Sequence, residues 1–300
     1  MIGEAQPWLD YRLRGYARGA NPGKHASDRQ GSGGAFRGLV PFWQNPDAGR
    51  LDIRRSLMDP GQMPMVRQTD QASTLSLVVA VDLTASMTAG GERAGGERAG
   101  RRAAHAIAEA AARSALRAGD KFGLIGFDQG VRAEVSLAPT RARGAVNAAL
   151  AALLAAPDSA GEALGLGQLA EALPRTRCLV LLISDFAMPV PLVEAAMTAL
   201  HRHDVAPIHL LGDGPAREGR EGARLGARLG ARLGLARVRD AEGGTARLVL
   251  LRPALDRAWR AGLARHHQAL AAVFARAGRD AFSTGATPDL VALSDHLLAV

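Results

Sequence analysis

The sequence predicts an α/β protein, with an open, mostly parallel sheet flanked by helices on both faces. Two unbroken apolar runs, residues 75–81 and 178–184, are typical of strands buried on both faces of a parallel sheet. An aspartate follows each run directly, Asp82 after the first and Asp185 after the second. Parallel strands end at the same edge of a sheet, and open α/β sheets bind ligands at that edge.

The composition fits a folded protein. The chain has 300 residues, of which 47% are hydrophobic, enough for a sizeable core. No apolar run approaches the roughly 20 residues that span a bilayer, and no secretion signal is recognisable, so we expect a cytoplasmic protein. The net charge is +8, but the basic residues are almost all arginines spread along the chain among acidic residues. Only 4% of residues are aromatic. Both observations argue against a nucleic-acid surface.

Three regions are expected along the chain. Residues 1–35 are rich in Arg and Gly and predict an irregular basic arm. Residues 36–74 carry apolar side chains between prolines, and we expect them to pack on the main domain. That domain, residues 75–300, is expected to contain the parallel sheet and its flanking helices.

Helical and strand patterns follow one another after Asp82. The tandem repeat GGERAGGERA at 90–99 predicts a loop, because glycine disfavours helix. Helices are predicted at 101–118, 141–155, 162–173, 191–203, 253–277 and from 288 onwards, and strands at 121–127, 131–137, 205–211 and near 280–283. Two further runs predict a small strand pair inserted near 235–251.

Residues 212–234 contain a GARL unit repeated three times. A helix there would align Arg224, Arg228 and Arg232 in one stripe, which makes them candidates for binding an acidic partner. Recurrent glycine costs about 1 kcal/mol per residue relative to alanine, so a frayed helix or a loop is an equal alternative.

The residues after the first strand have the chemistry of a metal site. Asp82, Thr84 and Ser86 alternate, so in an extended loop their oxygens point the same way. A carboxylate with two hydroxyls suits Mg²⁺, with Ca²⁺ and Mn²⁺ as alternatives. The same residue types also cap helices, but a second carboxylate, Asp185, at the same edge favours a cation site.

Signals for catalysis are missing. The chain has no Gly-x-Ser-x-Gly elbow and no phosphate-binding loop, and Thr84 stands where a phosphoryl-transfer aspartate normally has a second acid. We therefore expect a binding protein and not an enzyme, with a cation that takes a carboxylate from another protein as its final ligand. A metal-assisted phosphohydrolase and an RNA- or polyanion-binding module are the alternatives.

Three segments resemble a known family: DLTASM at 82–87, GDKFGL at 119–124 and ISDF at 183–186. They are similar to the von Willebrand factor A-like proteins, of the domain-of-unknown-function 58 type, that are encoded beside MoxR-type AAA+ ATPases. The likeness covers residues 36–298. The resemblance implies a von Willebrand factor A-like, Rossmann-like architecture for residues 75–300, with a metal-ion-dependent adhesion site. It also implies a non-enzymatic, chaperone-like adaptor that works with the ATPase. The adaptor would act in the maturation of a client protein, or in metal insertion into it, and the client would supply an acidic residue. The methanol-utilisation members imply methanol dehydrogenase as that client.

The chain departs from the family pattern at three places. Thr84 replaces the usual serine and keeps the hydroxyl, and Ile53 replaces a tryptophan. The threonine expected before the helix at 162–173 is missing, and Ser159 or Gly161 stands there instead. The resemblance implies that Ser159 is a further metal ligand if its loop bends towards the site.

Overall fold

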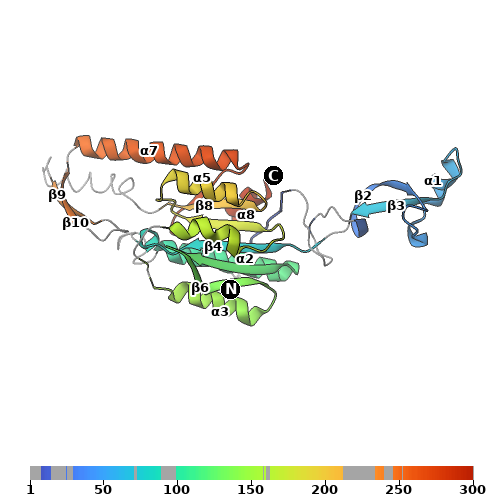
Figure 1. The fold of residues 1–300 in the computed structure, drawn as a ribbon, viewed down its shortest axis with the longest axis horizontal. Helices are drawn as coiled ribbons and strands as arrows, with labels where there is room; N and C mark the ends of the chain where they lie inside the picture. Colours follow the sequence, from blue (N-terminus) through green and yellow to red (C-terminus); the bar gives the residue numbers. More distant parts are fainter. Residues whose placement is uncertain are drawn as a thin grey trace, which may run out of the picture.

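The computed structural model describes residues 8–14, 25, 30–70, 73–88, 99–157, 159, 163–211, 234–239, 246–251 and 253–299. Its centre is a six-stranded sheet in the order β11-β8-β7-β4-β5-β6 (Figure 1). The strands are β4 (Ser76–Asp82), β5 (Lys121–Phe127), β6 (Val131–Thr140), β7 (Leu179–Ser184), β8 (Asp204–Leu210) and β11 (Phe282–Thr284). All neighbours are parallel except β6, which pairs antiparallel with β5. The predicted mostly parallel α/β sheet is confirmed.

The strand order places a topological switch point between β4 and β7. Numbered along the chain from β4, the sheet reads 3-2-1-4-5-6 from the β6 edge, so the chain leaves β4 towards one edge and later enters β7 on its other side. In such sheets the connections diverge at the switch point and leave a crevice at the carboxyl ends of the two strands. Asp82 is the last residue of β4 and Ser184 the last of β7, so both lie at this crevice.

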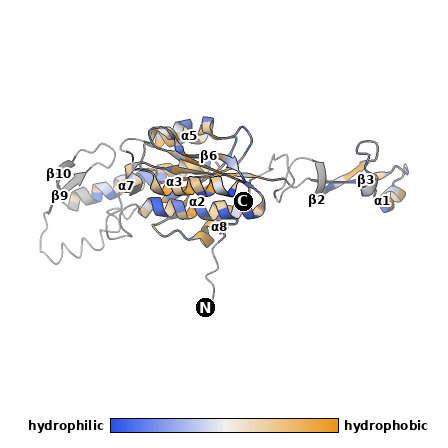
Figure 2. Cartoon of the chain, turned by 90° about the horizontal axis from the view of Figure 1, so that it is seen from below, coloured by the Kyte–Doolittle hydropathy of each residue, from blue (hydrophilic) through white to orange (hydrophobic). Residues whose placement is uncertain are grey.

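Alternate residues of β4 enter two separate hydrophobic clusters, as expected for a strand covered on both faces. Leu77, Val79 and Val81 pack with α2 (Ala99–Ala118), α3 (Arg143–Ala155) and α8 (Leu290–Leu298). Val78 and Ala80 pack with η3 (Leu164–Gln168), α4 (Leu169–Ala172), α5 (Val190–Ala199) and α7 (Pro253–Arg276). Figure 2 shows the apolar strands enclosed between these helices.

The predicted helix over 162–173 is only partly present. A short 3-10 segment, η3, leads into a single α-helical turn, α4. Gly165 explains the tight geometry, because a side chain there would come within 2.6 Å of the carbonyl oxygen of Gly130. This segment lies close against the β5–β6 turn, and it forms a 3-10 segment with one helical turn where a regular helix was predicted.

The segment at residues 8–14 has no regular secondary structure, but it packs on the domain, which the prediction of an arm did not include. Leu9 and Leu13 are buried in the core that includes α2 and α8. The Leu9 amide donates to Ser114 Oγ at 2.8 Å, and the Tyr11 hydroxyl donates to Asp120 at 2.7 Å. This segment, which we call the N-terminal strap, is thus part of the domain.

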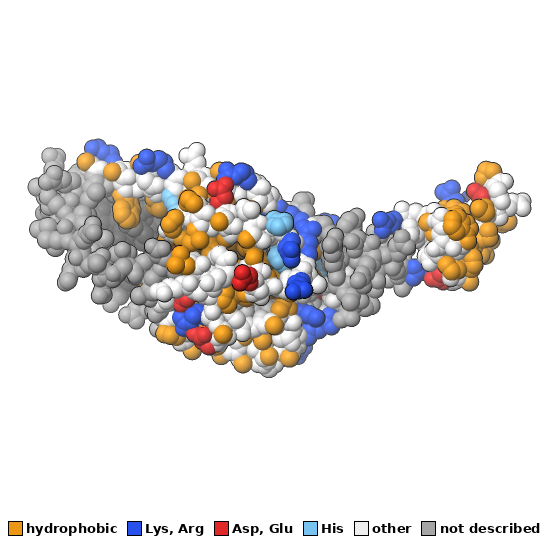
Figure 3. Space-filling model, viewed as in Figure 1, with side chains coloured by type: hydrophobic (Ala, Val, Ile, Leu, Met, Phe, Trp, Pro, Cys, Tyr) orange, Lys and Arg blue, Asp and Glu red, His pale blue; other side chains and the backbone are white. Residues whose placement is uncertain are grey.

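Residues 30–70 form a small antiparallel unit. It contains β2 (Gln30–Pro41), β3 (Met65–Asp70), η1 (Ala48–Arg50) and α1 (Ile53–Met58). The apolar residues here were predicted to pack on the main domain, but the following are exposed: Phe36, Trp43, Leu51, Ile53, Leu57, Met58 and Met63. Figure 1 shows the unit extending from the sheet, and Figure 3 shows hydrophobic atoms gathered on its surface. Turn formation and helix capping by Asp47 and Asp52 shape the unit, and it has no hydrophobic cluster of its own among the described residues.

The small strand pair predicted near 235–251 is present as β9 (Gly234–Arg239) and β10 (Ala246–Leu251), which pair antiparallel. Arg224, Arg228 and Arg232 lie outside the described residues. Within the described residues, no helix has the length and apolar character needed to cross a membrane.

Candidate metal centre

The candidate centre is built at the switch point, where β4 and β7 end side by side. Val81 pairs with Ile183 in parallel register, which brings the next residues, Asp82 and Ser184, together. The Ser184 hydroxyl donates to Asp82 Oδ2 at 2.7 Å, and Asp82 is only 1% exposed. Asp82 is thus a buried carboxylate anchored to the neighbouring strand.

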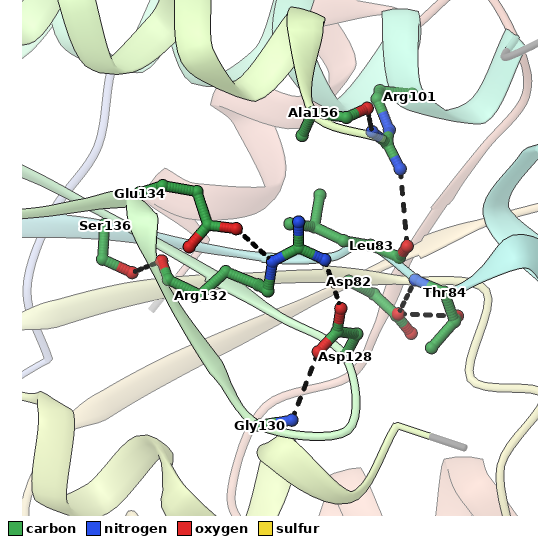
Figure 4. Close-up of polar contacts among 10 residues, drawn as sticks. All are labelled: Asp82, Leu83, Thr84, Arg101, Asp128, Gly130, Arg132, Glu134, Ser136 and Ala156. Carbon is green, nitrogen blue, oxygen red and sulfur yellow. Dashed lines mark hydrogen bonds and ion pairs between the residues drawn. The ribbon is translucent and has the colours of Figure 1, made fainter. Parts of the chain in front are cut away.

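The loop after β4 turns its hydroxyls towards this carboxylate. Both the amide and the hydroxyl of Thr84 donate to Asp82 Oδ1, at 2.9 and 2.7 Å (Figure 4). The loop bends into η2 (Ala85–Thr88) instead of staying extended, yet the hydroxyl oxygens of Thr84 and Ser86 lie 3.0 Å apart. The convergence expected from the alternation is therefore present, although a tight turn produces it and not an extended loop.

Asp185 completes the cluster from the end of β7. The Ser86 hydroxyl donates to its carboxylate, and the Ala187 amide donates to Oδ1 at 3.1 Å. The four side chains predicted from the sequence, Asp82, Thr84, Ser86 and Asp185, thus form one continuous polar network. The alternative interpretation was that these residues cap the helix that follows. Asp82 does not cap α2, because α2 begins at Ala99.

The two carboxylates lie in an unfavourable electrostatic environment. Burial and the nearby charge of Asp185 raise the pKa of Asp82 to about 6, although hydrogen bonds from Thr84 and Ser184 partly offset the effect. Burial also raises the pKa of Asp185, against hydrogen bonds from Ala187 and Ser86. The fold therefore holds two acidic groups together although burial makes ionisation of both more costly, and the charge of Asp185 adds to that cost for Asp82.

The backbone after Asp185 is strained and is held by histidines. Phe186 has a φ of 48°, in the left-handed region that a residue with a side chain rarely adopts. Its carbonyl accepts from His266 Nε2 at 2.8 Å, and the carbonyl of Asp185 accepts from the ring of His209. These contacts from α7 and β8 hold the backbone at Asp185 and Phe186 in place.

Ser159 lies beside the ligand loop. It pairs with Thr84 in an isolated parallel bridge, and the Ala85 amide donates to its carbonyl at 3.0 Å. Its hydroxyl donates to Asp128, in the β5–β6 turn. Ser159 therefore lies next to the ligand loop, and its assignment as a metal ligand stays a prediction.

Four further residues around the site were not singled out from the sequence: Ser184, Asp128, Arg101 and His266. Arg101 is 1% exposed and donates to the carbonyls of Ala156 and Leu83, which fixes the start of the ligand loop (Figure 4). Ser184 could have been found from the sequence, because it directly precedes Asp185 at the end of the predicted strand. Arg101 and His266 lie in helices whose pattern carries no such signal.

The donor set fits a hard divalent cation. Asp82, Asp185, Thr84 and Ser86 offer only oxygen atoms, which Mg²⁺, Ca²⁺ and Mn²⁺ prefer. In the part of the chain that the structure describes, no cluster of three or more His, Cys, Asp or Glu side chains is arranged to hold a metal. The candidate centre is therefore of the carboxylate–hydroxyl type, with two negative ligands at most from the described residues.

Comparison with known proteins gives one family. Residues 61–269 match the model of a family described as "Protein of unknown function DUF58". No curated protein matches the chain.

Several solved structures are similar in part. The conserved hypothetical protein BatB from Bacteroides thetaiotaomicron is 13% identical with a TM-score of 0.39, and the match covers 75% of this chain and 97% of that one. The SpRpn10 VWA domain is 16% identical with a TM-score of 0.37, over 75% of this chain and 94% of that one. Proximal thread matrix protein 1 from the mussel byssus, with a zinc-occupied MIDAS motif, is 15% identical with a TM-score of 0.30, over 46% of this chain and 37% of that one. The architecture described here rests on the strand order of the sheet and not on these scores.

Proposed function

The chain belongs to the DUF58 family, and from this premise we propose that it is a non-enzymatic, metal-dependent protein-binding adaptor. Asp82, Thr84, Ser86 and Asp185 would hold a divalent cation, Mg²⁺ in the first instance, with Ser159 as a further ligand. When bound, the cation supplies an electrophilic site that accepts a carboxylate from a partner protein.

One observation carries this proposal: the buried carboxylate of Asp82 and the half-buried carboxylate of Asp185 are held together, and neutral hydroxyls surround them. Ser184 and Thr84 donate to Asp82, and Ser86 donates to Asp185. Burial disfavours ionisation of both acids, and the charge of Asp185 further disfavours that of Asp82, so the arrangement opposes stability unless a positive charge is bound there.

The residues have separate roles in this adaptor. Asp82 and Asp185 provide the negative charge, and Thr84 and Ser86 provide neutral oxygen while donating their protons to these carboxylates. Ser86 and Asp185 are partly exposed, so a partner protein would approach the cation from their side, while Asp82 and Thr84 are buried behind them. Ser184 and Arg101 hold the two strand ends and the start of the loop in place.

The resemblance of the sequence motifs extends the proposal to partners. A MoxR-type AAA+ ATPase is the proposed partner, and the client is an enzyme that undergoes maturation or metal insertion. Methanol dehydrogenase is the client in the more specific form of the proposal, which follows the likeness to the methanol-utilisation member MxaS.

A capture experiment tests the adaptor function. The immobilised full chain is expected to retain the MoxR-type ATPase, or the client, in Mg²⁺ and to release it in EDTA, because the partner carboxylate binds only through the cation. Retention and release are measured by quantitative gel analysis. Equal retention with and without the chelator would mean that partner binding does not use this site.

Cation binding should depend on pH. Because the pKa of Asp82 is raised to about 6, lowering the pH through this value protonates the carboxylate and removes its negative charge. We expect the apparent Mn²⁺ affinity to fall by roughly tenfold for each pH unit below about 6, in titrations from about pH 8 to about pH 5. An affinity that stays constant over this range would exclude Asp82 as a ligand.

A further inference from the structure

The β5–β6 turn behind the candidate centre holds a second buried acid, Asp128, which the sequence marks only as a turn residue. Its side chain accepts hydrogen bonds from the Gly130 amide at 3.2 Å, from Arg132 Nη1 at 2.7 Å and from the Ser159 hydroxyl (Figure 4 shows the first two). Asp128 is therefore an acceptor that three donors hold in place.

The turn is in close contact with the segment that carries Ser159. The Gly165 amide donates to the Asp128 carbonyl at 2.8 Å, and the Val131 amide donates to Gln168 Oε1 at 3.4 Å. The space between Gly165 and Gly130 leaves no room for a side chain. The position of the β5–β6 turn is therefore fixed against η3.

Ser159 in turn pairs with the ligand loop that follows β4. Ser159 and Thr84 form a parallel bridge, and paired residues of adjacent strands present their side chains on the same face. The Ser159 side chain thus lies on the same face as the Thr84 hydroxyl, which takes part in the network with Asp82 and Ser86.

On the premise of the proposed cation site, we propose that Asp128 is a positioning residue that orients Ser159 as a ligand. A hydroxyl that binds a cation through a lone pair must direct its proton to another acceptor. Asp128 takes the proton of Ser159, so the lone pairs of Ser159 Oγ remain available on the face of Thr84. Acceptors behind metal ligands typically change metal affinity by about 10- to 100-fold.

A double-mutant cycle on the full chain tests this role, with Mn²⁺ affinity measured by titration. Asp128→Asn is expected to weaken Mn²⁺ binding roughly tenfold, because the amide can donate to the serine oxygen and occupy a lone pair. Ser159→Ala should cause a similar loss, and the double variant should bind no more weakly than Ser159→Ala alone, since Asp128 acts through Ser159. Ser159→Thr keeps the hydroxyl and should retain the affinity of the parent chain.

Two controls separate positioning from folding. Glu134→Gln makes the same carboxylate-to-amide change at an exposed partner of Arg132 in the same hairpin, and its Mn²⁺ affinity should equal that of the parent chain. Thermal unfolding without metal reports any loss of fold. Should Asp128→Asn not fold, Asp128→Ser takes its place in the cycle, with the same expected loss because the shorter side chain does not reach Ser159.

The possible outcomes distinguish the two proposals. Parent-level affinity in Asp128→Asn, or losses that multiply to about 100-fold in the double variant, would overturn the positioning role while the cation site stands. Failure of the parent chain to bind Mn²⁺ would overturn the proposed function, and the positioning role with it.

Discussion

Asp82→Asn is expected to weaken Mg²⁺ and Mn²⁺ binding by more than about 100-fold, beyond the range for residues that only support a ligand. The amide removes the negative charge at the centre of the network and keeps one oxygen acceptor, which serves Thr84 if the amide nitrogen takes the place of the oxygen that faces Ser184. Isothermal titration with each metal measures the loss. Capture of the partner should be lost in parallel.

The same variant should leave the metal-free protein as stable as the parent chain or more stable. The raised pKa of Asp82 means that the folded state favours the neutral form, so the stabilisation it gives is complete below the ordinary value of 3.8 and is lost as the pH rises through about 6. A permanently neutral side chain avoids that loss at neutral pH. Thermal unfolding checks this.

Asp295→Asn is the matched control for Asp82→Asn, because Asp295 is an exposed aspartate on α8. It should change neither metal affinity nor unfolding. Cation binding by Asp82→Asn at the parent affinity would show that Asp82 is not a ligand, whatever the control does.

Asp120→Ala is expected to cause the largest loss of stability. Asp120 is fully buried at the amino-terminal side of the sheet and accepts from the Leu75 amide at 2.8 Å and from the Tyr11 hydroxyl and His25 Nε2, both at 2.7 Å. Removing the carboxylate leaves these groups without their acceptor, at a cost of about 1–3 kcal/mol each, so we expect a loss of about 3 kcal/mol or more in the free energy of unfolding. Urea denaturation measures it.

The pH dependence of Asp120 has the opposite sign to that of Asp82. Burial raises the pKa of Asp120, but hydrogen bonds from His25, Leu75 and Tyr11 outweigh burial and lower it below 3.8. Its contribution is therefore present above 3.8 and is lost as the pH falls through the lower, folded-state pKa. In Asp120→Ala this acid-dependent part of the stability curve should disappear.

Asp10→Ala is the control within the N-terminal strap. Asp10 is exposed, and its ion pair with Arg117 is long, at 3.8 Å, so its removal should cost less than about 0.5 kcal/mol. An effect of Asp120→Ala no larger than that of Asp10→Ala would show that the strap is not anchored through Asp120.

The central sheet and the location of the candidate site could be predicted because both depend on local signals. The apolar runs of β4 and β7 are unbroken, and Asp82 and Asp185 follow them directly. Parallel pairing alone then places the two acids together. The order of polar residues in the loop likewise predicted the convergence of Thr84 and Ser86.

Other features depend on contacts between residues far apart in the sequence, which no local pattern records. The N-terminal strap has no helical or strand period, and it is held by Leu9, Leu13 and side-chain hydrogen bonds to residues such as Ser114 and Asp120. Asp128 has the sequence context of an ordinary turn, and only the approach of Ser159 gives it a second role.

The unit at residues 30–70 shows a different limit. Apolar residues such as Trp43 and Leu57 indicate burial when the sequence is considered alone. In the structure they are 69% and 75% exposed. Composition indicates that such side chains favour a partner, but it does not indicate which surface provides it.

The central claim is that one divalent cation binds between the ends of β4 and β7. Crystals soaked in Mn²⁺ and measured at the manganese absorption edge test it directly. We expect one anomalous peak within about 2–2.5 Å of oxygen atoms of Asp82, Thr84, Ser86 or Asp185. Well-ordered crystals with no peak there, or with the peak elsewhere on the molecule, would contradict the claim.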